Sequence, residues 1–451
     1  MAGLYNLGRA ISGMGAKQLP PVIDGTKVPS FCYTTINERW PKIVTKIIDQ
    51  LHQHQHTAVE LYGQQGDADV KSIISKLAEM RYRMMTDKPL QDIAEDFPNA
   101  DIWNTELEEY RKQRSIENVT WYKTPWLFVE CYLYCKILEF FWHTIHFRDY
   151  DPFRIEKERS YTDSMAHLLA IGTEVVKLTQ TNLNHEEIRK TIVRLLQFEI
   201  WGNKADLSLS GGDPHFMSDT IFQELDELKG NILANDLDVA CNTYFMGQGK
   251  KLSKLVIVLD NAGLELFTDL CFADFLISKS LVDTVVFHGK IFPWFVSDTT
   301  QKDFEWVLSQ VAGSDDKYLK QLGARWQDLV AQKKFVFKAH HFWTFGYPYC
   351  DMEAKSPELY NELKTSSLII FKGDLNYRKL VGDRYWPIGT QFSEALCGFE
   401  PAPLLALRTL KAETVAGLSQ TAIRLIESKF QKDDLSWMVS SDYAVAQLFT
   451  P

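Results

Sequence analysis

The chain has 451 residues and a formal net charge of −10, with 45% hydrophobic and 24% charged residues. This composition is ordinary for a globular protein, and the length is sufficient for two or three folded units. The acidic balance argues against general nucleic-acid binding, which needs basic surfaces that neutralise phosphates. An acidic protein that acts on a phosphorylated substrate needs local compensation from a metal ion or from a few lysines and arginines.

The cysteines and the apolar segments favour a protein of a reducing compartment. The seven cysteines are scattered, and Cys131 and Cys135 lie one helical turn apart within an apolar stretch, which is typical of buried thiols. We therefore predict a cytoplasmic protein, with the nucleus as a second compartment. The stretch 121–147 is long enough to cross a bilayer, but charged residues such as Glu130 and Lys136 interrupt it. We predict a buried helix with these charges on a minority face, and no membrane partner.

The first half of the chain shows mainly helical periodicity. Residues 1–25 are predicted to be a flexible tail, and residues 26–245 a helical lobe. The apolar spacing predicts helices over about 36–54, 70–86, 105–115, 121–147, 160–180, 186–199 and 218–234.

From about residue 250 the pattern changes, so that residues 246–451 are predicted to form an α/β domain. Apolar runs that are typical of buried strands cover 255–259, 284–288, 335–338, 367–371 and 403–407. Helical patterns between them cover about 263–280, 301–312, 316–332, 356–364 and 415–429. Alternation of this kind predicts βαβ units and a mostly parallel, layered sheet.

The run 255–259 is continuously apolar and ends abruptly at Asp260 and Asn261. Ligands of open α/β sheets bind just beyond the carboxyl ends of the strands, and an acid-amide pair there offers two oxygens to a hard cation. The alternative is that Asp260 only caps the following helix.

Polar residues also follow the other predicted strands. Asp298 follows 284–288 after a short loop and could be a third oxygen ligand for Mg²⁺ or Mn²⁺, or a helix N-cap. Arg378 and Lys379 follow 367–371, and Arg408 and Lys411 follow 403–407. These cations suit a phosphate group, although Lys411 could also be a solvated end. Together they predict a site at one edge of the sheet.

Several common enzyme classes lack their motifs here. The sequence has no GxxxxGK[ST] loop of a P-loop hydrolase and no GxSxG elbow of a serine hydrolase. No predicted strand is followed by a GxGxxG-type loop, so a dinucleotide or S-adenosylmethionine fold has little support.

Four motifs, in order along the chain, resemble the damage-control phosphatase family, formerly domain-of-unknown-function 89. They are LDNAG at 259–263, VSD at 296–298, GDLNYRKL at 373–380 and RTLK at 408–411. WGNKADLS at 201–208 and the helical first half are also similar. The RTxK pattern resembles the third subfamily, which includes sugar-phosphate phosphatases.

The resemblance implies a metal-dependent phosphatase with a three-layer α/β/α sandwich beside a helical lobe. Asp260, Asn261 and Asp298 would then bind a divalent metal, typically Mn²⁺, Co²⁺ or Ni²⁺. It also implies substrate contacts in the segment after the 367–371 strand and at the RTxK lysine, namely Asp374, Leu375, Asn376, Tyr377, Arg378 and Lys411. Lys411 would contact the phosphoryl group of substrates such as fructose 1-phosphate or fructose 6-phosphate. Asp374 would orient water as a base or bind a substrate hydroxyl.

Two other functions are weighed against this one. One branch of the family is associated with S-adenosylmethionine-dependent methylation of protein glutamates, but the missing glycine loop and the metal-like residue set count against that activity. A non-catalytic binding protein could instead expose Trp103, Trp121, Trp126 and Trp142, although aromatic-rich helices more often form core. Nothing in the sequence demands more than a monomer.

Overall fold

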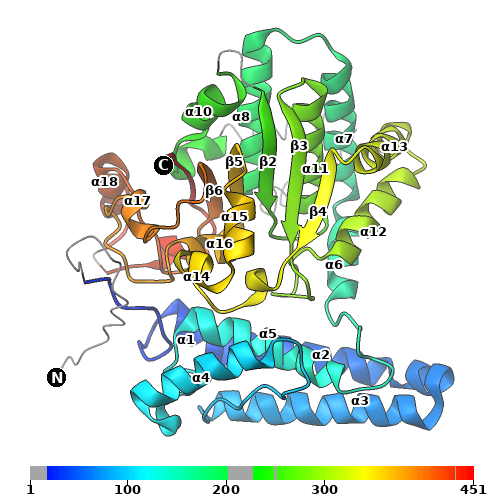
Figure 1. Cartoon of the computed structure of the whole chain (residues 1–451), viewed down its shortest axis with the longest axis vertical. Helices are drawn as coiled ribbons and strands as arrows, with labels where there is room; N and C mark the ends of the chain where they lie inside the picture. The colour runs from blue at the N-terminus through cyan, green and yellow to red at the C-terminus, as the bar shows by residue number, and fades with distance from the viewer. Residues whose placement is uncertain (1–17, 202–226, 248–250, 432) are drawn as a thin grey trace.

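The computed structural model describes residues 18–201, 227–247, 251–431 and 433–451. Its centre is a seven-stranded sheet of order β1-β7-β6-β5-β2-β3-β4 (Figure 1). The strands are β1 (Ile232–Asn235), β2 (Leu252–Val258), β3 (Val282–Gly289), β4 (Phe335–Ala339), β5 (Leu368–Lys372), β6 (Leu404–Thr409) and β7 (Ala444–Phe449). Every neighbouring pair is parallel except β6 and β7. The predicted mostly parallel α/β sheet is confirmed.

The described residues form seventeen α-helices, which lie around and beyond this sheet. Those before β1 are α1 (Phe31–Thr34), α2 (Trp40–Gln53), α3 (Gln55–Met85), α4 (Ala100–Arg114), α5 (Trp126–Trp142), α6 (Arg154–Asp163), α7 (Met165–Gln180) and α8 (His185–Trp201). Those after β1 are α10 (Leu237–Ala240), α11 (Leu264–Ser278), α12 (Gln301–Ala312), α13 (Lys317–Ala331), α14 (Met352–Lys355), α15 (Pro357–Leu363), α16 (Gly373–Leu380), α17 (Phe392–Ala395) and α18 (Gln420–Lys429).

Both faces of the sheet are covered, which explains why its strands are continuously apolar. Leu255 and Ile257 of β2 belong to one core with residues of α7, α8, α11, α12 and α13. Val256 and Val258 point to the opposite face and belong to the other core, which includes residues of α2 to α5 and α14 to α17. Successive strand residues thus supply two helical layers, as the period of two in a strand requires.

The strand order reverses direction at the centre of the sheet. From β2 the chain moves to β3 and β4 on one side, and then returns to β5 and β6 on the other. The carboxyl ends of β2 and β5 are therefore neighbours at a switch point, where connections leave in opposite directions and ligands of α/β sheets bind.

Helices α2 to α5 lie across one end of the sheet (Figure 1). Helix α5 is buried along residues 126–141, including Glu130, Lys136 and Glu139. The predicted buried helix is confirmed, and its charged residues are buried as well, with partners such as the Lys136–Glu139 pair at 2.5 Å. No helix in the described ranges is long and apolar enough to cross a membrane.

The burial of tryptophans and cysteines in the first half of the chain tests two further expectations. Trp103, Trp121 and Trp126 are at most 4% exposed, so they are core residues and not an interaction patch. Cys131 and Cys135 are buried and free, as predicted.

Two parts of the first half belong to the sheet region, which the sequence does not predict. The helix expected over 218–234 is wrong at its described end, since Ile232–Asn235 is strand β1, paired with β7. Helices α7 and α8 also pack against α11 on the sheet face. The division into 1–25, 26–245 and 246–451 stays a prediction.

Candidate active site at the carboxyl edge of the sheet

Asp260 lies at the switch point, two residues beyond the end of β2, and contacts the backbone that follows β5. A Cβ atom built on Gly373 would lie only 1.9 Å from Asp260 Oδ2, and Gly373 has φ of +83°. Only glycine tolerates both the contact and this backbone conformation at low cost. The sequence GD after β5 therefore brings the β5 terminus against the Asp260 carboxylate.

The second part of the site is a short backbone pairing between the segment after β2 and the loop after β3. Asn261 and Asp298 form an isolated antiparallel bridge, and Thr299 N donates to Asp260 O at 2.8 Å. Ser297 Oγ donates to Asn261 Oδ1 at 2.5 Å. The pairing places Asp260, Asn261 and Asp298 together, although they are separated along the chain.

The loop that presents Asp298 has an unusual backbone. Phe295 and Val296 have φ of +47° and +72°, and a positive φ is rare for a β-branched residue. Such strain costs on the order of 1–3 kcal/mol for each residue and clusters at functional sites. Packing offsets it here, because the Phe295 ring stacks on Tyr134 of α5 at 4.7 Å.

The electrostatics show an excess of negative charge. Burial raises the pKa of Asp260 well above its usual value, and the neighbouring Glu265 and Asp298 raise it further, while Lys290 and Lys411 lower it. Burial likewise raises the pKa of Asp298, opposed by Lys290, whose Nζ lies 3.1 Å from Asp298 Oδ2. A bound cation would relieve this repulsion.

The residues present fit a divalent metal ion. Asp298 Oδ2 is buried and, apart from its ion pair with Lys290 Nζ at 3.1 Å, has no hydrogen-bond partner among the described residues, so it can also bind a metal ion. Asp260 and Asn261 are half-buried and add carboxylate and amide oxygens, the donors that hard cations prefer. Across the described ranges, no three His, Cys, Asp or Glu side chains are grouped as a metal site, and the third oxygen donor of this set is the Asn261 amide.

A second polar pair lies at the neighbouring strand ends. Asp374, at the start of α16, accepts hydrogen bonds through Oδ1 from Arg408 Nε at 2.8 Å and from Lys411 N at 3.3 Å. Arg408 is fully buried and also holds the carbonyl of Ala412 at 3.1 Å, so it shapes the loop after β6 and is not a free phosphate ligand. Lys411 is half-buried, and its charge acts on Asp260.

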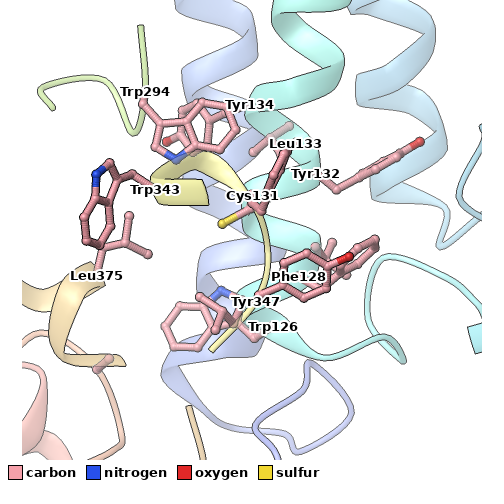
Figure 2. Packing of buried hydrophobic residues seen from close by; sticks show 14 of the residues in the cluster. Trp126, Phe128, Cys131, Tyr132, Leu133, Tyr134, Trp294, Trp343, Tyr347 and Leu375 are labelled. Atoms are coloured by element: carbon pink, nitrogen blue, oxygen red, sulfur yellow. The ribbon is translucent and has the colours of Figure 1, made fainter. Parts of the chain in front are cut away.

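The side chains of the other predicted substrate contacts are buried and pack or form hydrogen bonds within the protein. Leu375 is buried and belongs to the same hydrophobic core as Trp343 (Figure 2). Tyr377 is buried and its hydroxyl donates to Gln447 Oε1 at 2.8 Å. Asn376 donates to Leu259 O at 3.2 Å and so supports the backbone just before Asp260.

The two cationic side chains of this segment, Arg378 and Lys379, also have partners within the protein. Arg378 pairs with Glu130 and Asp383, and Lys379 Nζ donates to the carbonyls of Trp343 and Phe345. The expectation that the side chains of Leu375, Asn376, Tyr377 and Arg378 face the substrate does not fit their burial. Of the four cations predicted for phosphate, Lys411 alone is half-buried at the site, whereas the other three are at most 2% exposed.

Four residues of the site were not predicted: Glu265, Lys290, Ser297 and Lys372. Glu265 had a signal, since it is an acidic residue on the first turn of the helix that follows Asn261. Lys290 and Lys372 become visible only when the strands are paired. The WGNKADLS motif at 201–208 lies outside the described residues, apart from Trp201, which is buried at the end of α8.

Comparison with known proteins identifies the family of this chain. The family model of the damage-control phosphatase ARMT1-like domain matches residues 35–424. Damage-control phosphatase ARMT1 of Homo sapiens is 40% identical over 445 residues, covering 96% of this chain and 99% of the relative. Its namesake from Danio rerio is 38% identical over 444 residues, covering 96% of this chain and 98% of the relative.

Among solved structures, a DUF89 family protein from Pyrococcus horikoshii is similar at a TM-score of 0.39 and 14% identity, covering 86% of this chain and 94% of that one. The family match and the two relatives extend over nearly all of the chain. The chain therefore belongs to the damage-control phosphatase family.

Proposed function

We propose that this protein is a metal-dependent phosphatase that hydrolyses phosphomonoesters of small metabolites, with fructose 1-phosphate and fructose 6-phosphate as first candidates. Family membership supports a metabolite-repair phosphatase. The single observation that carries the metal dependence is the meeting of Asp260, Asn261 and Asp298 beyond the carboxyl end of β2, with excess negative charge. The RTLK sequence at 408–411 supports placement in the third subfamily.

In this proposal the three oxygen-bearing side chains bind Mn²⁺, Co²⁺, Ni²⁺ or Mg²⁺. The bound ion supplies charge neutralisation at the phosphoryl oxygens, which is the usual role of a metal in phosphoryl transfer. Lys411 binds a phosphoryl oxygen from the side of the β6 loop, where its ammonium stabilises charge that develops during hydrolysis.

Asp374 is proposed to orient the reactants. Arg408 and the Lys411 backbone N–H occupy Oδ1 and fix the carboxylate, while no described residue donates to Oδ2. Oδ2 can therefore accept a hydrogen bond from a substrate hydroxyl or from the attacking water. The carboxylate is 18% exposed, so either group can reach it.

The test is phosphate release from a panel of sugar phosphates and p-nitrophenyl phosphate. The protein is treated with EDTA, and Mg²⁺, Mn²⁺, Co²⁺ or Ni²⁺ is then added back. We expect turnover to return with at least one metal in the wild type and to stay at least 100-fold lower in Asp298→Asn. A matched control is Asp274→Asn, which changes another buried aspartate, far along α11 in the Arg325 pair. Equal turnover with and without metal would contradict the proposal.

A further inference from the structure

We propose that Glu265 is a positioning residue that fixes the amide orientation of Asn261 for metal binding. This inference rests on the proposed metal site and adds a residue that the motif does not assign to it. Glu265 is on the first turn of α11 and is 6% exposed. Its Oε2 accepts a hydrogen bond from Asn261 Nδ2 at 2.8 Å.

The amide of Asn261 has three partners, and their chemistry allows one orientation. The carboxylates of Glu265 and Asp260 accept hydrogen bonds from Nδ2, at 2.8 and 3.0 Å. The Ser297 hydroxyl donates to Oδ1 at 2.5 Å. Carboxylates cannot donate to an amide oxygen, so a flipped amide would place its oxygen against two negative groups. The orientation observed directs Oδ1 toward the loop that carries Asp298.

Glu265 is itself held from behind by a buried lysine. Lys372, the last residue of β5, lies 3.4 Å from Glu265 Oε1 and 2.8 Å from Asp269 Oδ1, and it also contacts Glu199 of α8. Burial opposes its charge, yet Asp269, Glu199 and Glu265 hold the pKa of Lys372 well above its usual value. One ammonium thus anchors Glu265 and joins β5, α8 and α11 behind the site.

This geometry is that of an outer hydrogen-bond partner of a metal ligand. Such partners fix the ligand and are worth about 10- to 100-fold in metal affinity. Glutamine at position 265 keeps an oxygen that can accept the hydrogen bond from Asn261, and Lys372 keeps its ion pairs with Asp269 and Glu199. Methionine has a similar length but no strong acceptor. The two substitutions therefore separate amide orientation from the charge of Glu265.

The experiment measures Mn²⁺ affinity calorimetrically on metal-stripped, full-length protein, with no substrate present. We expect Glu265→Gln to bind within about threefold of the wild type, and Glu265→Met to bind at least tenfold more weakly. Glu265→Ala is measured as well, because it removes the acceptor without placing a long apolar chain beside Lys372. Thermal unfolding without metal selects the variants that fold. Asp274→Asn is the control on the same helix, and we expect it to leave Mn²⁺ affinity unchanged.

The outcomes separate this inference from the proposed function. Wild-type affinity in Glu265→Met or Glu265→Ala would overturn the inference while leaving the metal site intact. Equal weakening in Glu265→Gln and Glu265→Met would also overturn it, because charge and not amide orientation would then govern binding. Failure of the wild type itself to bind Mn²⁺, Co²⁺, Ni²⁺ or Mg²⁺ would instead refute the metal-dependent function.

Discussion

Two buried charge clusters lie near the carboxyl edge of the sheet, and they differ in how completely their charges are paired. In the first, Arg378 donates to Glu130 at 2.5 Å and to both carboxylate oxygens of Asp383, at 3.0 and 2.9 Å. Its guanidinium also lies 3.7 Å from the centre of the Trp126 ring. This cluster is closed, since its charges and hydrogen bonds are satisfied within the protein.

In the second cluster, which we call the open cluster, the carboxylates of Asp260, Glu265 and Asp298 repel one another, and Asp298 Oδ2 lacks a well-formed hydrogen bond. Lys290 compensates only part of this charge. Each cluster contains charged residues that follow parallel strands and that the sequence predicts to be functional, namely Arg378 in the first and Asp260 and Asp298 in the second. The difference teaches that unsatisfied charge, and not charge itself, marks the candidate site.

The largest effect on stability is expected in the closed cluster. Arg378→Met leaves Glu130 and Asp383 buried without their cation, which should lower the free energy of unfolding by about 3–5 kcal/mol. Urea denaturation measures this change. The control Arg154→Met breaks an exposed pair with Glu158 and should cost no more than about 0.5 kcal/mol. A small effect of Arg378→Met would remove the distinction between the clusters.

In the open cluster, Lys411 is the charge available to a substrate. Lys411→Ala should lower kcat/KM for the best sugar phosphate by about 100-fold, or about 2.7 kcal/mol, because a cation that stabilises the transition state is lost. Lys411→Arg should restore part of the rate. The exposed Lys429→Ala is the matched control and should leave the steady-state kinetics unchanged. Wild-type kcat/KM in Lys411→Ala would exclude a role for this cation.

The sequence predicts the central elements because local and tertiary signals agree there. The apolar run 255–259 corresponds to β2, and the pattern at 301–312 matches α12, which begins with a capping box between Thr300 and Asp303. The sequence signal is weaker for β1 and β7. Strand β1 has only four residues, and β7 returns antiparallel after α18, so neither follows the βαβ alternation.

The sequence predicts the site as a set of strand ends, and the structure brings Asp260, Asn261 and Asp298 together, although their role in metal binding stays a prediction. Sequence could not tell which cations of GDLNYRKL face outward, because α16 begins directly at Gly373 and turns Tyr377 and Arg378 into the core. Their partners, Gln447 and Glu130, lie far away in the chain. Such pairings depend on topology and leave no local pattern.

A third prediction concerns Lys379, a buried cation next to the closed cluster. Burial lowers the pKa of Lys379 to about 8, whereas a lysine in the unfolded chain has a pKa of about 10.4. Between these pH values the unfolded state binds more protons, so this residue makes stability rise with pH by up to about 1.4 kcal/mol per pH unit. Urea denaturation from pH 7 to 10.5 should show this slope as a difference between wild type and Lys379→Met. Parallel pH profiles would mean that Lys379 titrates normally.

The smallest effect is expected at Ser297, where one neutral hydrogen bond supports the open cluster. Ser297→Ala removes the donor to Asn261 Oδ1 but leaves both acceptors of its Nδ2, so the amide keeps its orientation. A hydrogen bond of this kind is worth about 1 kcal/mol or less, which predicts a Mn²⁺ affinity within about fivefold of the wild type. The control Ser366→Ala removes a buried hydroxyl that has no partner among the described residues, and it should leave the affinity unchanged. A loss of 100-fold in Ser297→Ala would assign the orientation of Asn261 to the hydroxyl instead of to Glu265, and would move the control of the open cluster from α11 to the loop after β3.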